Sequence, residues 1–218
     1  MKRRSWKLFL PFAWIIAVPQ TTLPQGCALP SSFLLSKVPA IQQQAQFWCW
    51  AASSQMVFAF LSVSTQQCDM ATQRFSTAAT PLACCPAPAN CNDPTQFDQC
   101  NAESIPFTNG LTFTKNPGTT LTFARITQIL ACDKSPIIVK RTAVGAIADG
   151  HYIVIVGFKD LNPAGAGNPD PQKQQLQIID PDCLQSLSTQ ETLTYDYYQS
   201  NPIYLFSEEQ YDYQKQSH

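Results

Sequence analysis

One cysteine of the chain stands where a thiol could act as a nucleophile. Residues 47–52 read FWCWAA, and Cys49 opens a run without glycine or proline whose apolar side chains recur at helical spacing. A thiol in the first turn of a helix lies at the positive end of the helix dipole, which favours the thiolate. The alternative is a buried or disulfide-bonded structural cysteine. The position of Cys49 predicts a nucleophile.

A histidine provides the base that such a thiol needs. The chain has 2 histidines, and His218 is its last residue, which leaves His151. Imidazole is the side chain that exchanges protons near neutral pH. Residues 149–158 read DGHYIVIVGF, which predicts a strand that begins close to His151. A histidine packed in a strand is the alternative, and the cysteine makes a thiolate–imidazole pair the preferred interpretation.

A carboxylate is expected to orient the imidazole and to fix its tautomer. Asp180 ends a short apolar run and is followed by Pro181, so it is expected at the end of a strand. An Asx turn before the proline is the alternative explanation for this aspartate. Asp149 and Asp182 are weaker candidates for the same role.

Acyl transfer also needs hydrogen-bond donors for the oxyanion. The backbone N–H of Cys49 can supply one donor at the helix start. Gln43 lies six residues before the cysteine and can supply a side-chain amide as the second. Gln42, Gln44 and Gln46 are alternatives for this second donor.

The elements that must position these residues follow an order of helices first and strands second. Helices are expected at 49–61, 66–75 and 123–131, and strands at 137–139, 152–157, 176–179 and 203–206. Residues 28–40 are expected to form an extended leader, and residues 76–120 a loop that needs disulfides to fix it. This order predicts an α+β fold with an antiparallel sheet.

Nine cysteines indicate an oxidising compartment. No pair shows the spacing of a zinc site, so neither a metal nor another cofactor is expected. The odd number leaves one thiol outside any bridge. Most of the others are predicted to be bridged, and the neighbours Cys84 and Cys85 are expected to have different partners. The predicted set is Cys68, Cys84, Cys85, Cys91, Cys100, Cys132 and Cys183, with Cys27 as an eighth member.

The first 26 residues have the pattern of a signal peptide. Residues 2–4 read KRR, and an apolar run follows at 8–18. A buried N-terminal helix is the alternative. We expect a secreted, periplasmic or extracellular protein whose domain covers residues 27–218, with no membrane span after processing. Residues 23–27 resemble a lipoprotein box only loosely, which leaves a lipid anchor at Cys27 as an option. The net charge of −1 argues against nucleic acid as a partner.

Three sequence islands give the chain a family resemblance. Gln43 is followed after five residues by Cys49, a tryptophan and a predicted helix, which resembles the nucleophile segment of papain-like cysteine peptidases. The strand from Gly150-His151 to Gly157-Phe158 is similar to the histidine strand of these enzymes. With the Trp-Cys-Trp-Ala-Ala core and the Asp180-Pro181 pair, the pattern is closest to bacterial leader-peptidase-like proteins and secreted effector proteases. The islands span residues 38–182.

The resemblance implies a papain-like fold, with an N-terminal helical lobe whose central nucleophile helix packs on a C-terminal antiparallel sheet. It implies hydrolysis of a peptide or protein substrate through Cys49, His151 and Asp180, with Gln43 as oxyanion donor. Two other functions stay open. One is a cell-wall amidase or acyl transferase that uses the same cysteine and histidine. The other is a non-catalytic binding module on a peptidase-like fold, against which the presence of all four residues argues.

Overall fold

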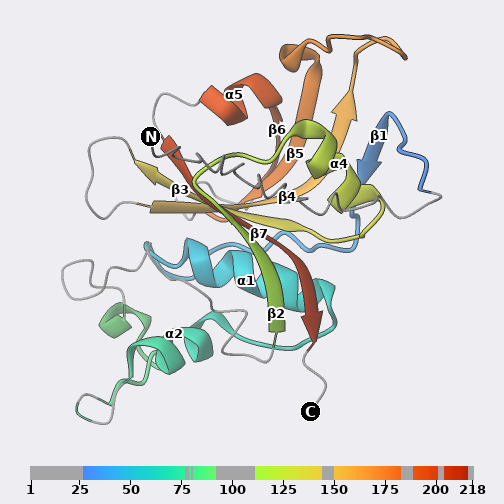
Figure 1. Ribbon diagram of the computed structural model, residues 1–218. Coiled ribbons are helices and arrows are strands. Elements are labelled where there is room, and N and C mark those ends of the chain that lie inside the picture. Colours follow the sequence, from blue (N-terminus) through green and yellow to red (C-terminus); the bar gives the residue numbers. More distant parts are fainter. Residues whose placement is uncertain are drawn as a thin grey trace, which may run out of the picture.

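The computed structural model describes residues 27–76, 79, 81–91, 111–143, 150–182, 189–200 and 204–215 (Figure 1). Within these described ranges, four α-helices are assigned, together with seven strands and two short 3-10 helices. In chain order they are β1 (Ser32–Leu34), α1 (Cys49–Phe60), α2 (Gln67–Phe75), η1 (Pro88–Cys91), β2 (Leu111–Pro117), α4 (Phe123–Ala131), β3 (Ile137–Ala143), β4 (Gly150–Asp160), η3 (Pro171–Lys173), β5 (Gln174–Asp180), β6 (Thr189–Thr194), α5 (Tyr195–Ser200) and β7 (Tyr204–Lys215).

One antiparallel sheet of seven strands forms the centre of the molecule. Its order is β2-β7-β3-β4-β5-β6, and β1 pairs with β4 beside this path. Helix α1 packs against β4, whereas α4 packs against β1 and β4, and α5 against β5 and β6. Figure 1 shows α1 below the central strands and both α4 and α5 above them. The expected α+β class is therefore confirmed.

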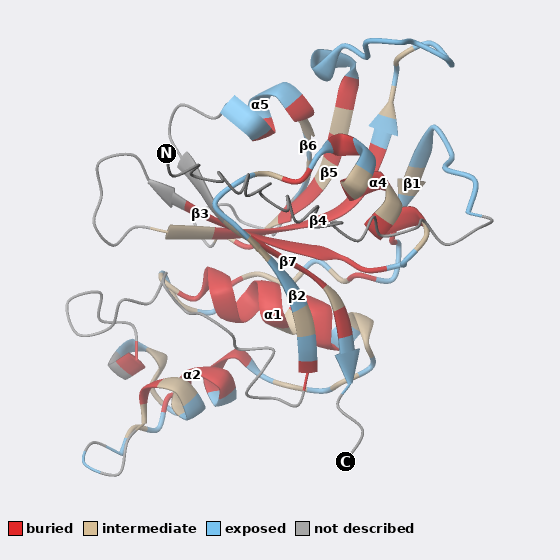
Figure 2. Cartoon of the chain, in the orientation of Figure 1, coloured by how far each residue is buried: buried red, intermediate tan, exposed pale blue. Residues whose placement is uncertain are grey.

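Helix α1 is buried along almost its whole length, as the red ribbon in Figure 2 shows. Apart from Gln55, its residues are apolar or small on every side, and a helix of that kind is stable only inside a core. Strand β4 is likewise buried without a break from Tyr152 to Phe158. The contact between these two elements is thus the centre of the hydrophobic core.

Gly157 allows a close approach in the middle of β4. A Cβ atom at this position would lie 2.6 Å from the carbonyl oxygen of Phe33 and would also collide with the side chain of Gln177. Strand β1 pairs with β4 here, with Leu34 opposite Gly157. Any larger residue would push β1 away from the sheet.

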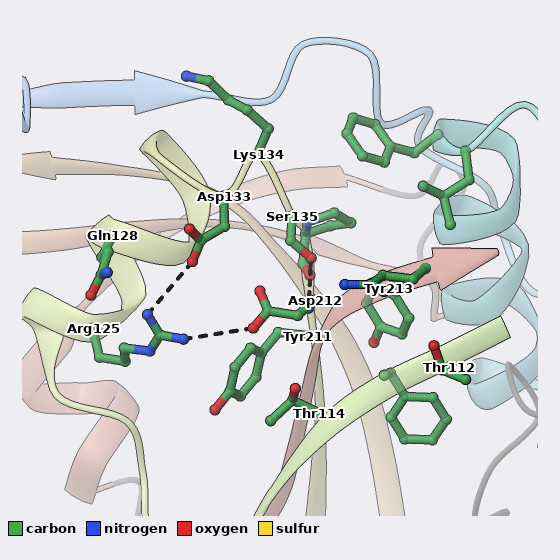
Figure 3. A pocket seen from close by; sticks show the side chains of 15 residues that line it. Thr112, Thr114, Arg125, Gln128, Asp133, Lys134, Ser135, Tyr211, Asp212 and Tyr213 are labelled. Carbon is green, nitrogen blue, oxygen red and sulfur yellow. Dashed lines mark hydrogen bonds and ion pairs between the residues drawn. The ribbon is translucent and has the colours of Figure 1, made fainter. Parts of the chain in front are cut away.

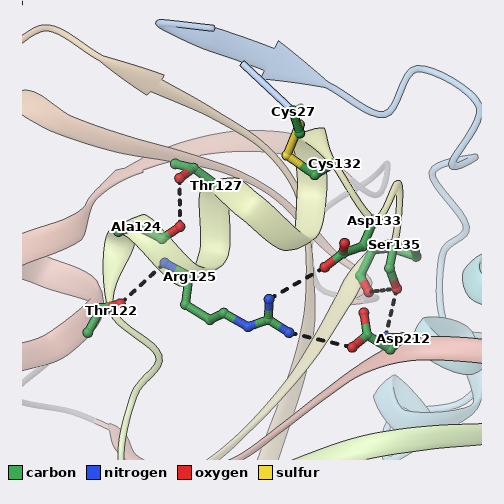
Figure 4. Close-up of polar contacts among 10 residues, drawn as sticks. Cys27, Thr122, Ala124, Arg125, Thr127, Cys132, Asp133, Ser135 and Asp212 are labelled. Carbon is green, nitrogen blue, oxygen red and sulfur yellow. Dashed lines mark hydrogen bonds and ion pairs between the residues drawn. A yellow bond between two sulfur atoms is a disulfide. The ribbon is translucent and has the colours of Figure 1, made fainter. Parts of the chain in front are cut away.

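Three disulfide bonds join described residues, namely Cys27–Cys132, Cys68–Cys85 and Cys84–Cys91. The prediction that Cys84 and Cys85 bond to different partners is confirmed. Among the described cysteines, Cys49 is the one outside a disulfide. Cys100 and Cys183 lie outside the described residues. The bridges join the N-terminal segment to the end of α4 (Figure 4), and α2 to the segment that follows it.

Parts of the expected element pattern need correction. The prediction of a loop throughout 76–120 is wrong for Leu111–Pro117, which forms β2 at one edge of the sheet and pairs with β7. The expected extended leader contains the short strand β1. The last strand is longer than the predicted 203–206 and extends to Lys215. Strands of this kind take their hydrogen bonds from partners far along the chain, so local sequence shows them weakly.

The described ranges contain no helix that is both long enough and apolar enough to cross a membrane. The predicted targeting segment 1–26 lies outside the described residues, and the boundary at residue 27 stays a prediction.

Candidate active site

Cys49 is the first residue of α1 and is 3% exposed. The preceding residue, Trp48, makes no side-chain cap, and the first turn contains no acidic residue. The N–H groups at the helix start are therefore not neutralised by a capping carboxylate within that turn. A sulfur atom at this position lies in the positive field of the helix terminus.

His151 and Asp180 come together across two neighbouring strands. His151 is the second residue of β4, and Asp180 is the last residue of β5. The imidazole Nε2 lies 2.8 Å from Oδ1 and 2.8 Å from Oδ2 of the carboxylate. Both side chains are partly buried, at 18% and 20% exposure. Because Nε2 is bound to the carboxylate, Nδ1 is the ring nitrogen left to exchange a proton with a reacting group.

Asp180 also forms the Asx turn that the sequence allowed as the alternative explanation for this residue. The backbone N–H of Asp182 donates to its Oδ1 at 3.0 Å. The aspartate therefore combines an Asx turn with the contact to the imidazole, and the turn holds the carboxylate in place. Asp182 enters this arrangement through its backbone N–H. Asp149 lies outside the described residues.

Gln43 is tied to the same strand end. Its backbone N–H donates to the carbonyl oxygen of Pro181 at 2.9 Å. Its side-chain Nε2 donates to the carbonyl oxygen of Gln46 at 2.7 Å, which fixes the rotation of the amide. Gln43 is 6% exposed, whereas Gln44 and Gln46 are exposed. Gln42 is partly buried. Of the four glutamines, Gln43 is thus the buried one.

Gln67 is a residue of this region that the sequence did not reveal. It lies in the first turn of α2 and has no exposed surface, at 0%. Its amide accepts from the backbone N–H of Gln44 at 2.8 Å and donates to the carbonyl oxygen of Gln42 at 2.8 Å. It thereby holds the chain on both sides of Gln43. A polar residue at a helix start carries no signal for such a contact, because Gln42 and Gln44 lie more than twenty residues away.

A cavity of about 990 Å³ lies elsewhere in the molecule (Figure 3). It is lined by Phe60 and Leu61 at the opposite end of α1 from Cys49. A helix of 12 residues spans roughly 18 Å, so this cavity is remote from the thiol. Its wall carries Arg125, which pairs with Asp133 at 3.5 Å and Asp212 at 3.6 Å (Figure 4).

Burial raises the pKa of the Asp212 carboxyl in this wall, and nearby Asp133 raises it further, while Arg125 opposes both effects. The cavity therefore has its own charge network, separate from the His151–Asp180 pair.

Within the described ranges, one group of side chains is close enough to hold a metal ion, formed by Cys68, Asp69 and Cys85. The sulfur atoms of Cys68 and Cys85 are joined in a disulfide. A sulfur in a disulfide is not a thiolate and so cannot serve as a metal ligand of the usual kind. This group is therefore a structural bridge.

A sheet that holds a hydrogen-bonded histidine and aspartate packs on a buried helix that starts with an unbridged cysteine, and this arrangement fits a papain-like cysteine peptidase. The family model for the papain-like cysteine protease AvrRpt2 matches residues 33–182 of this chain. That match covers more than half of the 218 residues, and the chain belongs to this family of cysteine proteases. No curated protein matches the chain.

Proposed function

We propose that the protein is a secreted peptidase that hydrolyses peptide bonds with Cys49 as nucleophile, His151 as base and Asp180 as the group that orients the imidazole. The observation that carries the proposal is the contact between Nε2 of His151 and both oxygens of Asp180. This contact directs Nδ1 to the role of proton carrier. The family match supports a peptide or protein as the substrate.

The first half of the reaction forms a thioester. The Cys49 thiolate attacks the carbonyl carbon of the scissile peptide bond, and the C–N bond breaks while protonated His151 gives its proton to the leaving amine. The charge of Asp180 stabilises the imidazolium before this transfer. In the second half, neutral His151 takes a proton from water, and the hydroxide displaces the thiolate and releases the acid.

Two donors are proposed for the oxyanion that forms in each half. The backbone N–H of Cys49 lies at the uncapped helix start. The Gln43 amide carries two hydrogens on Nε2, and its rotation is fixed by the bond to Gln46. Donors that are fixed in advance stabilise the transition state without reorganisation.

Secretion is proposed from the bridges and from the predicted targeting segment. Disulfides persist in oxidising compartments, and three join described residues. The bridge to Cys132 uses the sulfur of Cys27. A lipid thioether would need that same sulfur, so a lipid anchor at Cys27 and this bridge exclude one another. We therefore favour the bridged, unlipidated form.

The test uses the full chain, expressed in an oxidising compartment with its bridges verified. A mixture of peptides serves as substrate, and Cys49→Ala is the matched control. We expect cleavage by the wild type alone, and labelling of Cys49 by a thiol-directed epoxide inhibitor, located by peptide mapping. His151→Ala should slow the labelling. Cleavage that persists in Cys49→Ala, or a correctly bridged wild type that neither cleaves nor takes the label, would contradict the proposal.

A further inference from the structure

We propose that Trp48 and the Cys84–Cys91 disulfide hold the nucleophile in its working position, so that reduction of this bridge inactivates the peptidase. The inference rests on the proposed role of Cys49 and adds a regulation to it. Trp48 and Cys91 are positioning residues, because they act through Cys49, the residue that follows Trp48.

Trp48 is fixed by three hydrogen bonds at the start of α1. Its backbone N–H donates to the carbonyl oxygen of Ala45 at 3.0 Å, and its own carbonyl oxygen accepts from the N–H of Ala52 at 2.9 Å. Its indole N–H donates to the carbonyl oxygen of Cys91 at 3.1 Å. The side chain has no exposed surface, at 0%. Of these three bonds, the indole bond joins the start of α1 to a distant part of the chain, at Cys91.

The acceptor of that bond lies in a segment held by disulfides. Cys91 ends the short helix η1 and is bridged to Cys84, and both cysteines are 0% exposed. The backbone N–H of Cys84 donates to Oγ1 of Thr72 in α2 at 3.0 Å. Residue 85 is bridged to Cys68, also in α2. The segment from Cys84 to Cys91 is therefore anchored to α2 at its first two residues, and the Cys84–Cys91 disulfide joins its last residue to that anchored end.

Helix α2 packs against α1, so the bridged segment and the nucleophile helix belong to one packed unit. Figure 1 shows α2 beside α1. A four-residue 3-10 helix has little stability of its own. Without the bridge, the Cys91 carbonyl is linked covalently to the anchored end through the intervening backbone alone. The indole N–H would then lose a fixed acceptor, and the backbone that carries the Cys49 sulfur would lose one of its restraints.

We expect activity to depend on the strength of the reductant. Catalysis needs Cys49 as a thiolate, whereas the positioning contact needs Cys84 and Cys91 oxidised. A dithiol reductant supplies two electrons: its two sulfurs join in a ring, the Cys84–Cys91 bond breaks, and each freed sulfur takes a proton. Weak reductant therefore keeps the enzyme active, and stronger reductant inactivates it.

The sharpest variant is Trp48→Phe, which removes the indole N–H but keeps an aromatic ring in the site. Trp50→Phe is the matched control, because within the described part of the chain the buried indole N–H of Trp50 has no hydrogen-bond partner. We expect Trp48→Phe to lower kcat by about tenfold or more, since small displacements of a reacting group cost about that much. KM should change by less than about twofold, and Cys49 alkylation should shift in its pH profile. Trp50→Phe should leave both nearly unchanged.

The bridge is tested by replacing Cys84 and Cys91 together with serine. We expect a loss in kcat similar to that of Trp48→Phe, and little further loss when the two changes are combined, because both act through one hydrogen bond. The double replacement of Cys27 and Cys132 by serine is the control. It should lower the melting temperature and leave kcat unchanged.

A titration of the wild type with dithiothreitol gives an independent measurement. Loss of activity should follow the appearance of Cys84 and Cys91 thiols in peptide maps, with the circular dichroism spectrum preserved. Wild-type kcat in Trp48→Phe, or full activity after both sulfurs are reduced, would overturn the inference. A wild type that cleaves nothing would instead contradict the proposed function, so the two failures are distinguishable.

Discussion

Nε2 of His151 lies at equal distances of 2.8 Å from the two carboxylate oxygens of Asp180, although the residues are 29 positions apart in the chain. The antiparallel pairing of β4 with β5 brings them together, with Val154 opposite Ile179. The hydrogen bond from the backbone N–H of Asp182 holds the same carboxylate. The imidazole is thus oriented by a group that is itself restrained.

Asp180→Asn is expected to retain more activity than Asp180→Ala. Asparagine can still accept a hydrogen bond from Nε2 through its carbonyl oxygen, whereas alanine offers no acceptor and leaves the ring free to rotate. Alanine also removes the acceptor of the Asp182 N–H. We expect kcat/KM in the order wild type, Asn, Ala, with the Ala variant down by about a hundredfold or more. Equal activity of all three proteins would reduce Asp180 to a turn residue.

Gln67→Met should impair acyl transfer without impairing the thiol. The change removes the bonds to Gln42 and Gln44 and releases the segment that carries Gln43; it also removes one bond to Gln55 in α1. We expect kcat to fall by about tenfold, which is less than the loss of an oxyanion donor itself. Alkylation of Cys49 by iodoacetamide forms no oxyanion and should keep its rate.

Gln73→Met is the control for this variant, since Gln73 lies in the same helix with its side chain exposed. Both rates should stay at the wild-type level in this protein. Slower alkylation in Gln67→Met would mean that the change disturbs the nucleophile helix as a whole, and would contradict a specific effect on the oxyanion site.

The three bridges should differ in their contribution to stability. Their sequence separations are 105 for Cys27–Cys132, 17 for Cys68–Cys85 and 7 for Cys84–Cys91. Loop-closure entropy predicts contributions of about 4.7, 3 and 2.5 kcal/mol, because longer loops lose more freedom in the unfolded chain. Serine pairs at each bridge, compared by urea unfolding, should follow this order. The bridge proposed to position Trp48 is therefore expected to stabilise the fold least, and a reversed order would contradict the entropic explanation.

Glu209 is expected to make the stability of the fold depend on pH. Its carboxylate is buried in β7 and accepts bonds from the hydroxyl of Tyr198, the side chain of Asn116 and the N–H of Leu121. Burial raises the pKa of this carboxyl above its ordinary value, and the hydrogen bonds from its neighbours oppose that shift. A raised pKa means that the folded state binds the proton more tightly than the unfolded state does.

The contribution of Glu209 to the free energy of unfolding should therefore be fully present below the ordinary glutamate pKa and should be lost as the pH rises through the folded value. The raised pKa of Asp212 adds to the same trend. In Glu209→Gln the decrease should be smaller, since only the Asp212 part remains. Urea unfolding at a series of pH values from about 4 to 7 measures both slopes. If the free energy of unfolding changes equally with pH in the two proteins, the pKa of Glu209 does not change on folding, and the prediction is wrong.

The sequence alone identified the residue types on which the proposed chemistry depends. Only one histidine lies away from the chain end, and only one cysteine opens a long apolar run without helix breakers. Such assignments rest on local features, namely side-chain acidity and the burial of a helix that is apolar on all sides. For the same reason the helices at Cys49–Phe60, Gln67–Phe75 and Phe123–Ala131 could be predicted closely.

Only the tertiary structure decided which partners these residues have. The choice of Asp180 over Asp182 depends on the strand register. The position of Gln43 depends on its backbone bond to Pro181 and on the bonds from Gln67 to the neighbouring residues Gln42 and Gln44. The disulfide pairing and the bond from Trp48 to Cys91 also join distant segments. A contact between distant residues forms only when the whole core has brought their backbones together, because the entropy of closing each loop is compensated by packing elsewhere. No local pattern records that balance, so the candidate residues could be proposed from the sequence, whereas the contacts between them could not.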